Sequence, residues 1–84
     1  MDRPHDAVLR FSEPDERRAR LVADAVAVET TGVAAVDDRS RTGVAQTDET
    51  VVVRVEAADL VALRAACATW TRLVGVAERV AGGM

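Results

Sequence analysis

The chain has 84 residues and no lysine, tyrosine, isoleucine or asparagine, and its aromatics are one phenylalanine and one tryptophan. A single cysteine, Cys67, excludes an internal disulfide and a metal centre built from several thiolates. We expect Cys67 to be a small buried hydrophobic residue. The purely apolar runs are only a few residues long, so we expect no membrane span. The first residues lack the apolar region of a signal peptide, which makes a cytoplasmic protein the expectation.

Alanine, valine and arginine dominate what is present. Ala and Val supply 31 of the 84 residues, and such small side chains predict a thin core. One domain of this size buries only about 60% of its unfolded surface, so burial against a partner would stabilise it. All eleven basic residues are arginine, against fourteen acidic ones. The net charge of −3 argues against strong nucleic-acid binding by the chain alone.

The first half of the chain predicts a strand followed by a helix. Alternating apolar residues indicate a strand over residues 5–11. Ser12 and Asp15 then match a capping box, with Pro14 in the first helical turn, where its missing N–H costs nothing. An amphipathic helix follows and is expected to end at residues 30–32, because glycine is typical just past a helix end.

The second half predicts a hairpin and a long helix. Residues 33–38 fit either a loop or a short strand, 39–47 a strand weakened by Gly43, and 50–56 a strand whose valines alternate. Asp59 suits the N-cap of the last helix. The order β-α-β-β-α predicts an α+β fold in which two helices pack on one face of a three-stranded antiparallel sheet.

The last helix carries two apolar stripes, although covering a small sheet needs only one. We expect the first stripe to face the sheet: Leu60, Leu63, Cys67, Trp70, Val74 and Ala77. The second stripe predicts a partner interface at Thr69, Leu73, Val76 and Val80, with Ala62 and Ala66 on the same face. The alternative is a helix that simply exposes a few apolar side chains.

Polar residues give no catalytic constellation. His5 is the only histidine, so a metal site or a nucleophile–base pair is not expected, and the chain is not expected to be an enzyme. Four arginines form the one polar feature of interest: Arg10, Arg39, Arg41 and Arg54. They can cluster on the sheet surface opposite the helices and bind phosphate. The alternative is a solvated face neutralised by Asp37, Asp38 and Glu56.

Three segments carry a resemblance to a known family. Asp-Arg-Ser-Arg at 38–41 enters the second strand, Val-Arg-Val-Glu-Ala-Ala-Asp-Leu-Val-Ala-Leu-Arg-Ala-Ala at 53–66 opens the last helix, and Thr-Trp-Thr-Arg-Leu-Val at 69–74 continues it. Together with the length and the order of elements, they resemble the small Pcc-type subunit of the KEOPS complex, in an archaeal and halophilic version. The resemblance covers residues 5–81 of a single domain, 1–84.

The resemblance implies a function that the residues alone do not. KEOPS makes threonylcarbamoyladenosine in tRNA, and its ATPase-fold Kae-type subunit performs the catalysis. A Pcc-type subunit is a non-catalytic dimerisation and scaffold module without cofactors. It forms a homodimer, packs its helices against the catalytic subunit and helps the complex to bind tRNA. The second stripe would then be the partner interface, and the four arginines would be candidates for tRNA contact.

Two other kinds of function stay open from the residues. One is a stand-alone KH-like RNA-binding domain, although the chain lacks the Gly-x-x-Gly loop that such domains use, and its charge is negative. The other is a dimeric regulatory domain for a small ligand, although the sequence indicates no convergent polar pocket.

Overall fold

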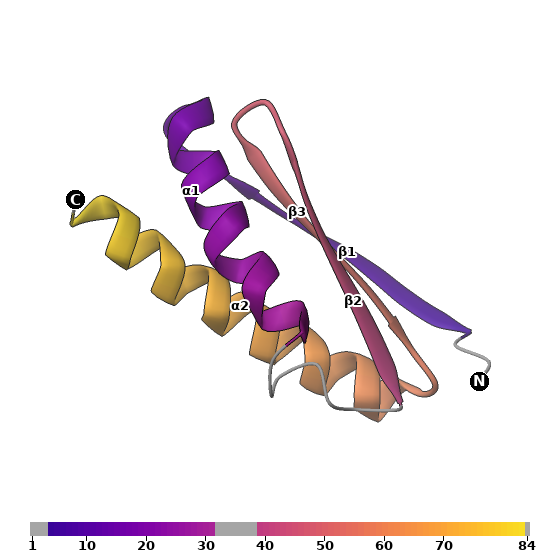
Figure 1. Ribbon diagram of the computed structural model, residues 1–84. Coiled ribbons are helices and arrows are strands. Elements are labelled where there is room, and N and C mark those ends of the chain that lie inside the picture. The colour runs from indigo at the N-terminus through magenta and orange to yellow at the C-terminus, as the bar shows by residue number, and fades with distance from the viewer. Residues whose placement is uncertain (1–3, 32–38, 84) are drawn as a thin grey trace.

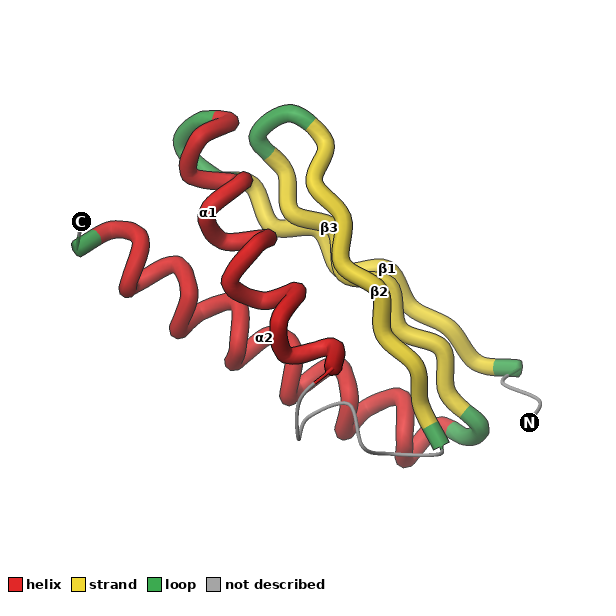
Figure 2. Tube along the Cα trace, viewed as in Figure 1, coloured by secondary structure: helices red, strands yellow, loops and turns green. Residues whose placement is uncertain are grey.

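The computed structural model describes residues 4–31 and 39–83. The elements in chain order are β1 (His5–Ser12), α1 (Glu16–Ala27), the 3-10 helix η1 (Val28–Thr31), β2 (Ser40–Thr47), β3 (Thr50–Ala57) and α2 (Leu60–Gly82). The sheet is antiparallel in the order β1-β3-β2, and both helices lie on one side of it (Figures 1 and 2). The predicted α+β fold is therefore confirmed.

The central strand β3 separates the two faces of the sheet. Val51, Val53 and Val55 are fully buried toward the helices, and the residues between them are more exposed. Leu9 and Val44 lie opposite Val53 on the two neighbouring strands and pack against the same core. The predicted valine strand is confirmed, and its alternation gives the sheet one apolar face and one polar face.

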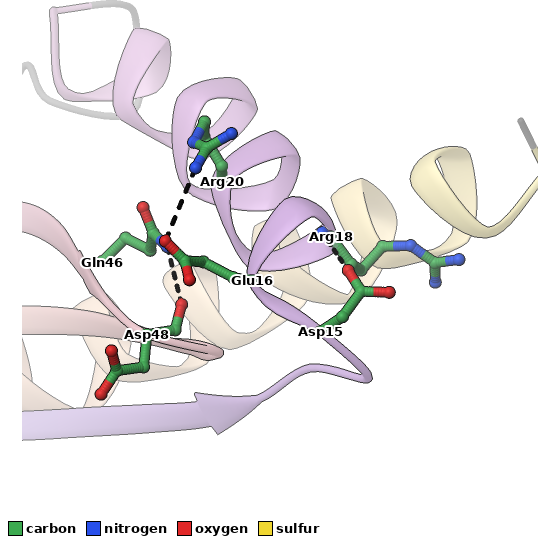
Figure 3. A network of polar contacts seen from close by, with 6 residues as sticks. All are labelled: Asp15, Glu16, Arg18, Arg20, Gln46 and Asp48. Atoms are coloured by element: carbon green, nitrogen blue, oxygen red, sulfur yellow. Dashed lines mark hydrogen bonds and ion pairs between the residues drawn. The ribbon is translucent and has the colours of Figure 1, made fainter.

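The start of α1 differs from the expectation. Asp15 is the N-cap, and one of its carboxylate oxygens accepts a hydrogen bond of 2.7 Å from the Arg18 N–H (Figure 3). The predicted capping box is wrong because β1 extends through Ser12, which pairs with Thr50 in the sheet. Pro14 lies before the cap and not in the first turn, since the helix begins at Glu16.

The connections around β2 agree more closely with the predictions from the sequence than the start of α1 does. The turn at residues 48–49 joins β2 to β3, and Asp48 adopts a positive φ of 51°, a conformation that Asp tolerates. Gln46 Nε2 donates a hydrogen bond of 2.7 Å to the Asp48 carbonyl (Figure 3). α1 ends at Ala27 and the chain continues as η1 to Thr31, near the expected helix end. The ambiguous segment 33–38 lies outside the described residues.

Helix α2 packs on the sheet through a narrower stripe than the sequence predicts. Trp70 and Val74 are buried, and Leu63 and Ala77 pack partly against the core. Leu60 is 59% exposed, so its predicted place on the sheet is wrong. It directly follows the N-cap Asp59 and lies at the margin of the buried face. The predicted burial of Cys67 is reached only in part, because the side chain is half-buried.

The apolar character of α2 raises the question of a membrane. This helix has 23 residues, and an 18-residue window within it has a mean hydropathy of 1.3, so it could cross a bilayer by length and composition alone. The core helix of a globular domain meets the same criteria. Two of its large side chains, Trp70 and Val74, are buried against α1 and the sheet, which accounts for part of its apolar surface.

Candidate functional site

An apolar groove runs between the two helices on the side of the domain away from the sheet's polar face. Its volume is about 260 Å³. The residues of its walls come from α1, η1 and α2: Leu21, Ala25, Val26, Glu29, Leu73, Val76, Ala77, Val80 and Ala81. Val26 and Ala81 are buried, whereas Val76 is 43% and Val80 62% exposed. An open, largely apolar groove between two helices is a common binding surface for a third helix.

The groove contains most of the predicted partner stripe. Leu73, Val76 and Val80 lie in its α2 wall, so the structure brings these three together. Thr69 is half-buried one turn earlier and is not part of the wall. Successive helical residues are rotated by roughly 100°, which puts Val76 roughly 120° around the helix from the buried Trp70. The second stripe is therefore a distinct face of α2.

The α1 half of the groove was not predicted as an interface. Leu21, Ala25 and Val26 belong to the amphipathic face of α1, and from the sequence that whole face reads as core. Ala25 is exposed and Leu21 half-buried, because α1 crosses α2 and leaves the edge of this face uncovered. The single-helix periodicity gives the apolar face but not how a second helix divides it.

Three of the four predicted arginines lie on the polar face of the sheet. Arg54 in β3 is opposite Val8 of β1 and Gly43 of β2. Arg10 lies two residues along β1 from Val8, and Arg41 lies two residues along β2 from Gly43, so both are on the same face as Arg54. The three therefore follow a diagonal across β1, β3 and β2. Diagonal neighbours on a sheet are about 7–8 Å apart, which arginine side chains can bridge. We call Arg10, Arg54 and Arg41 the arginine diagonal.

The surface around the arginine diagonal is partly open to solvent and partly acidic. Arg10 and Arg54 line a hollow with residues of the β2–β3 hairpin, among them the acidic Asp48 and Glu49. Gly43, beside Arg54, has nothing within 4 Å of where a Cβ would lie, so this part of the face is open. Arg41 lies directly opposite Glu56 in the register of β2 and β3, so the alternative of a neutralised surface stays open.

The fourth arginine lies elsewhere. Arg39 precedes β2, and its guanidinium forms an ion pair with Asp59, the N-cap of α2. The Ala58 N–H also donates a hydrogen bond of 2.8 Å to the Arg39 carbonyl. The hydrogen bond from Arg39 lowers the pKa of the Asp59 carboxyl below its ordinary value, and the bond from the Ala62 N–H lowers it further. Arg39 thus ties β2 to the start of α2.

Comparison with known proteins agrees with the residue-level resemblance. A family model described as transcription factor Pcc1 matches residues 6–82, nearly the whole chain. No curated protein matches the chain. The β-α-β-β-α domain with its interhelical groove is therefore a member of the Pcc1 family, a family of KEOPS subunits.

Proposed function

We propose that this chain is the non-catalytic dimerisation and scaffold subunit of a cytoplasmic KEOPS complex, which bridges catalytic subunits and aids tRNA binding. The family match supports membership of the complex. The observation that carries the scaffold role is the apolar groove between α1 and α2. The partner that fits it is the ATPase-fold Kae-type subunit, which would present an amphipathic helix.

The composition of the groove indicates what that helix should carry. Its walls are apolar along the length formed by Leu21, Leu73, Val76 and Val80, which suits a stripe of aliphatic side chains. Glu29 is the charged residue among the described wall residues, and it is half-buried. A basic side chain on the partner helix would pair with Glu29 and fix the direction of the helix.

The arginine diagonal and the groove lie on opposite sides of the domain. Both helices cover the apolar face of the sheet, whereas Arg10, Arg54 and Arg41 project from the other face. A subunit built in this way can hold a protein partner through its helices and contact tRNA phosphates through its sheet. The net charge of −3 makes the tRNA contact dependent on the assembled complex.

The test is association with the Kae-type subunit after Leu73→Asp or Val76→Asp. Each change buries a carboxylate in the apolar interface, and we expect at least about a tenfold loss in affinity, which is about 1.4 kcal/mol. Val61→Asp is the matched control, because Val61 is 70% exposed on the same helix and does not line the groove. Circular dichroism monitors the fold. Unchanged binding of both groove variants would contradict the proposal.

A further inference from the structure

A buried carboxyl lies where β1 leads into α1. Glu13 is 8% exposed, and it is the buried charged residue of the described part of the chain. Its backbone N–H donates a hydrogen bond of 2.8 Å to the Glu49 carbonyl in the β2–β3 turn, which fixes its position. Within residues 4–31 and 39–83, its Oε2 is buried without a hydrogen-bond partner. Burying an ionised carboxylate in this way is unfavourable, so the site favours a proton.

The charged groups facing Glu13 come from both helices. The Glu78 carboxyl of α2 lies within hydrogen-bonding reach of the Glu13 carboxyl once one of the two carries a proton, and the Arg18 guanidinium of α1 is close enough for its charge to act on Glu13. The β2–β3 turn contributes the Glu49 carbonyl. Burial, followed by the hydrogen bond and the charge of Glu78, raises the pKa of Glu13 to about 7, although the Arg18 charge acts in the opposite direction. A hydrogen bond between two carboxyls needs one shared proton.

Glu78 lies in the last turns of α2, on a side that faces away from Val76 and Val80. Glu78 lies between Val76 and Val80 in the sequence, and it is rotated from Val80 by roughly 200° around the helix. Arg18 reaches the same end of α2, since its Nη1 would lie 3.7 Å from a Cβ on Gly82. Glu13, Arg18 and Glu78 therefore connect β1, α1 and the groove-forming end of α2.

We propose that Glu13 and Glu78 form a proton-dependent clasp that fastens the C-terminal turns of α2 and thereby adjusts the groove. With one proton shared, the two carboxyls attract, and Val76, Val80 and Ala81 are held in the groove wall. With both ionised, the carboxyls repel across a poorly solvated contact and these turns loosen. The link from the clasp to partner binding rests on the proposed function; the clasp itself does not.

The direction of the pH effect follows from proton binding. Glu13 has an ordinary pKa of 4.5 and a folded-state pKa of about 7. Between these values the folded protein holds more protons than the unfolded chain, so its stability falls as pH rises through this window. The clasp is complete below the window and lost above it.

The clasp is tested on the isolated full chain by Glu13→Gln. A glutamine amide can donate a hydrogen bond to the Glu78 carboxyl without a titrating proton of its own, so position 13 no longer contributes to the pH dependence of the contact. From about pH 5 to about pH 9, we expect protection of the last α2 amides from hydrogen exchange, corrected for intrinsic rates, to fall about tenfold or more in the wild type. In Glu13→Gln it should stay constant. Carboxyl carbon shifts should show Glu13 titrating near neutral pH.

Two further variants keep the test decisive. Glu78→Gln provides the same kind of donor from the other side and should reduce the pH dependence. Glu16→Gln is the matched control, because Glu16 is exposed and pairs with Arg20 on the outside of α1, and it should behave like the wild type. Equal pH dependence in Glu13→Gln and wild type would overturn the clasp, as would a Glu13 carboxyl that titrates at its ordinary value.

The link to the groove needs the catalytic subunit. Wild-type affinity for that subunit should weaken as pH rises through the same window, and Glu13→Gln should remove the part of the change due to this chain. A clasp that titrates while the two proteins show the same pH dependence of binding would overturn the link but not the clasp. Absence of binding at every pH would contradict the proposed function instead.

Discussion

At the scale of single residues, Asp59 combines two roles. Its Oδ1 accepts the Ala62 N–H at 2.8 Å as an N-cap, and its Oδ2 pairs with Arg39. The cap satisfies a backbone donor that the first helical turn cannot satisfy itself. The ion pair links the same carboxylate to Arg39, which directly precedes β2. One side chain thus sets both the start of α2 and its attachment to β2.

Asp59→Asn should separate these roles through acid sensitivity. The amide keeps a capping oxygen but loses the charge that pairs with Arg39. Because the folded-state pKa of Asp59 is lowered, its contribution to stability is present above the ordinary value of 3.8 and is lost as pH falls below it. We expect the variant to melt below the wild type at neutral pH, and the two curves to converge in acid. Calorimetry across this range measures the difference.

A control for this experiment lies in the hairpin turn. Asp48→Asn changes an exposed aspartate at a positive φ that asparagine also adopts, so its melting temperature should follow the wild type at each pH. A gap between Asp59→Asn and wild type that persisted unchanged into strong acid would assign the effect to the lost cap geometry and contradict the role of the charge.

The residues that the sequence could not identify are those whose role depends on distant segments. Glu13 looks like an ordinary helix-flanking acid in the sequence, and only the arrival of α2 buries it beside Glu78. Arg39 reads as a strand-entry cation, but the hairpin returns the chain so that it meets Asp59, twenty residues later. Local sequence patterns carry no information about contacts between residues that are distant in the sequence.

At the scale of elements, the sequence pattern predicts the three strands of the described residues and the extent of α2. The alternating valines of β3 and the cap at Asp59 predict positions that the structure confirms. The predicted start of α1 is wrong because Ser12 and Asp15 both suit an N-cap. Ser12 pairs with Thr50 in the sheet, and Asp15 is the N-cap. Which of the two residues caps the helix depends on how far β1 pairs with β3, and this pairing joins segments that are distant in the sequence.

The groove also shows that local sequence patterns do not predict how two elements pack against each other. The second stripe of α2 gives Leu73, Val76 and Val80 from the sequence alone, and the structure brings them into one wall. The opposite wall required the crossing of α1 over α2, which sets how much of Leu21 and Ala25 is left open. An apolar stripe therefore predicts that something packs there, and the packing of its neighbours determines the shape of what fits.

At the scale of the whole molecule, several large apolar side chains are exposed. Val28, Leu60, Val61, Val76 and Val80 are the exposed large hydrophobic residues of the described chain. The core is built mostly from valine and alanine around one tryptophan, so it contributes little burial per residue. We expect the isolated protein to be a dimer at micromolar concentration. Light scattering that gave the mass of one folded chain would contradict this expectation.

The tRNA role of the sheet is a separate prediction for the assembled complex. Phosphate contacts release counterions, so each lost contact should make the salt dependence of affinity shallower by about one unit. We expect Arg41→Ala combined with Arg54→Ala to weaken tRNA binding and reduce the slope by about two units, because both residues belong to the arginine diagonal. ATP hydrolysis by the partner without tRNA should not change, since these residues lie on the face away from the helices.

Two further variants separate phosphate contact from general loss of charge. Arg17→Ala removes an exposed arginine on α1, outside the arginine diagonal, and should leave the slope unchanged. Arg39→Ala tests whether the guanidinium beside Asp59 also contacts tRNA. If the melting temperature changes but the salt dependence of tRNA affinity does not, Arg39 serves only to attach α2. If the double variant and the wild type gave superimposable binding curves across the salt series, the arginine diagonal would be a solvated surface. Its basic charges would then be balanced by neighbours such as Glu56, and the tRNA path would have to run over another subunit.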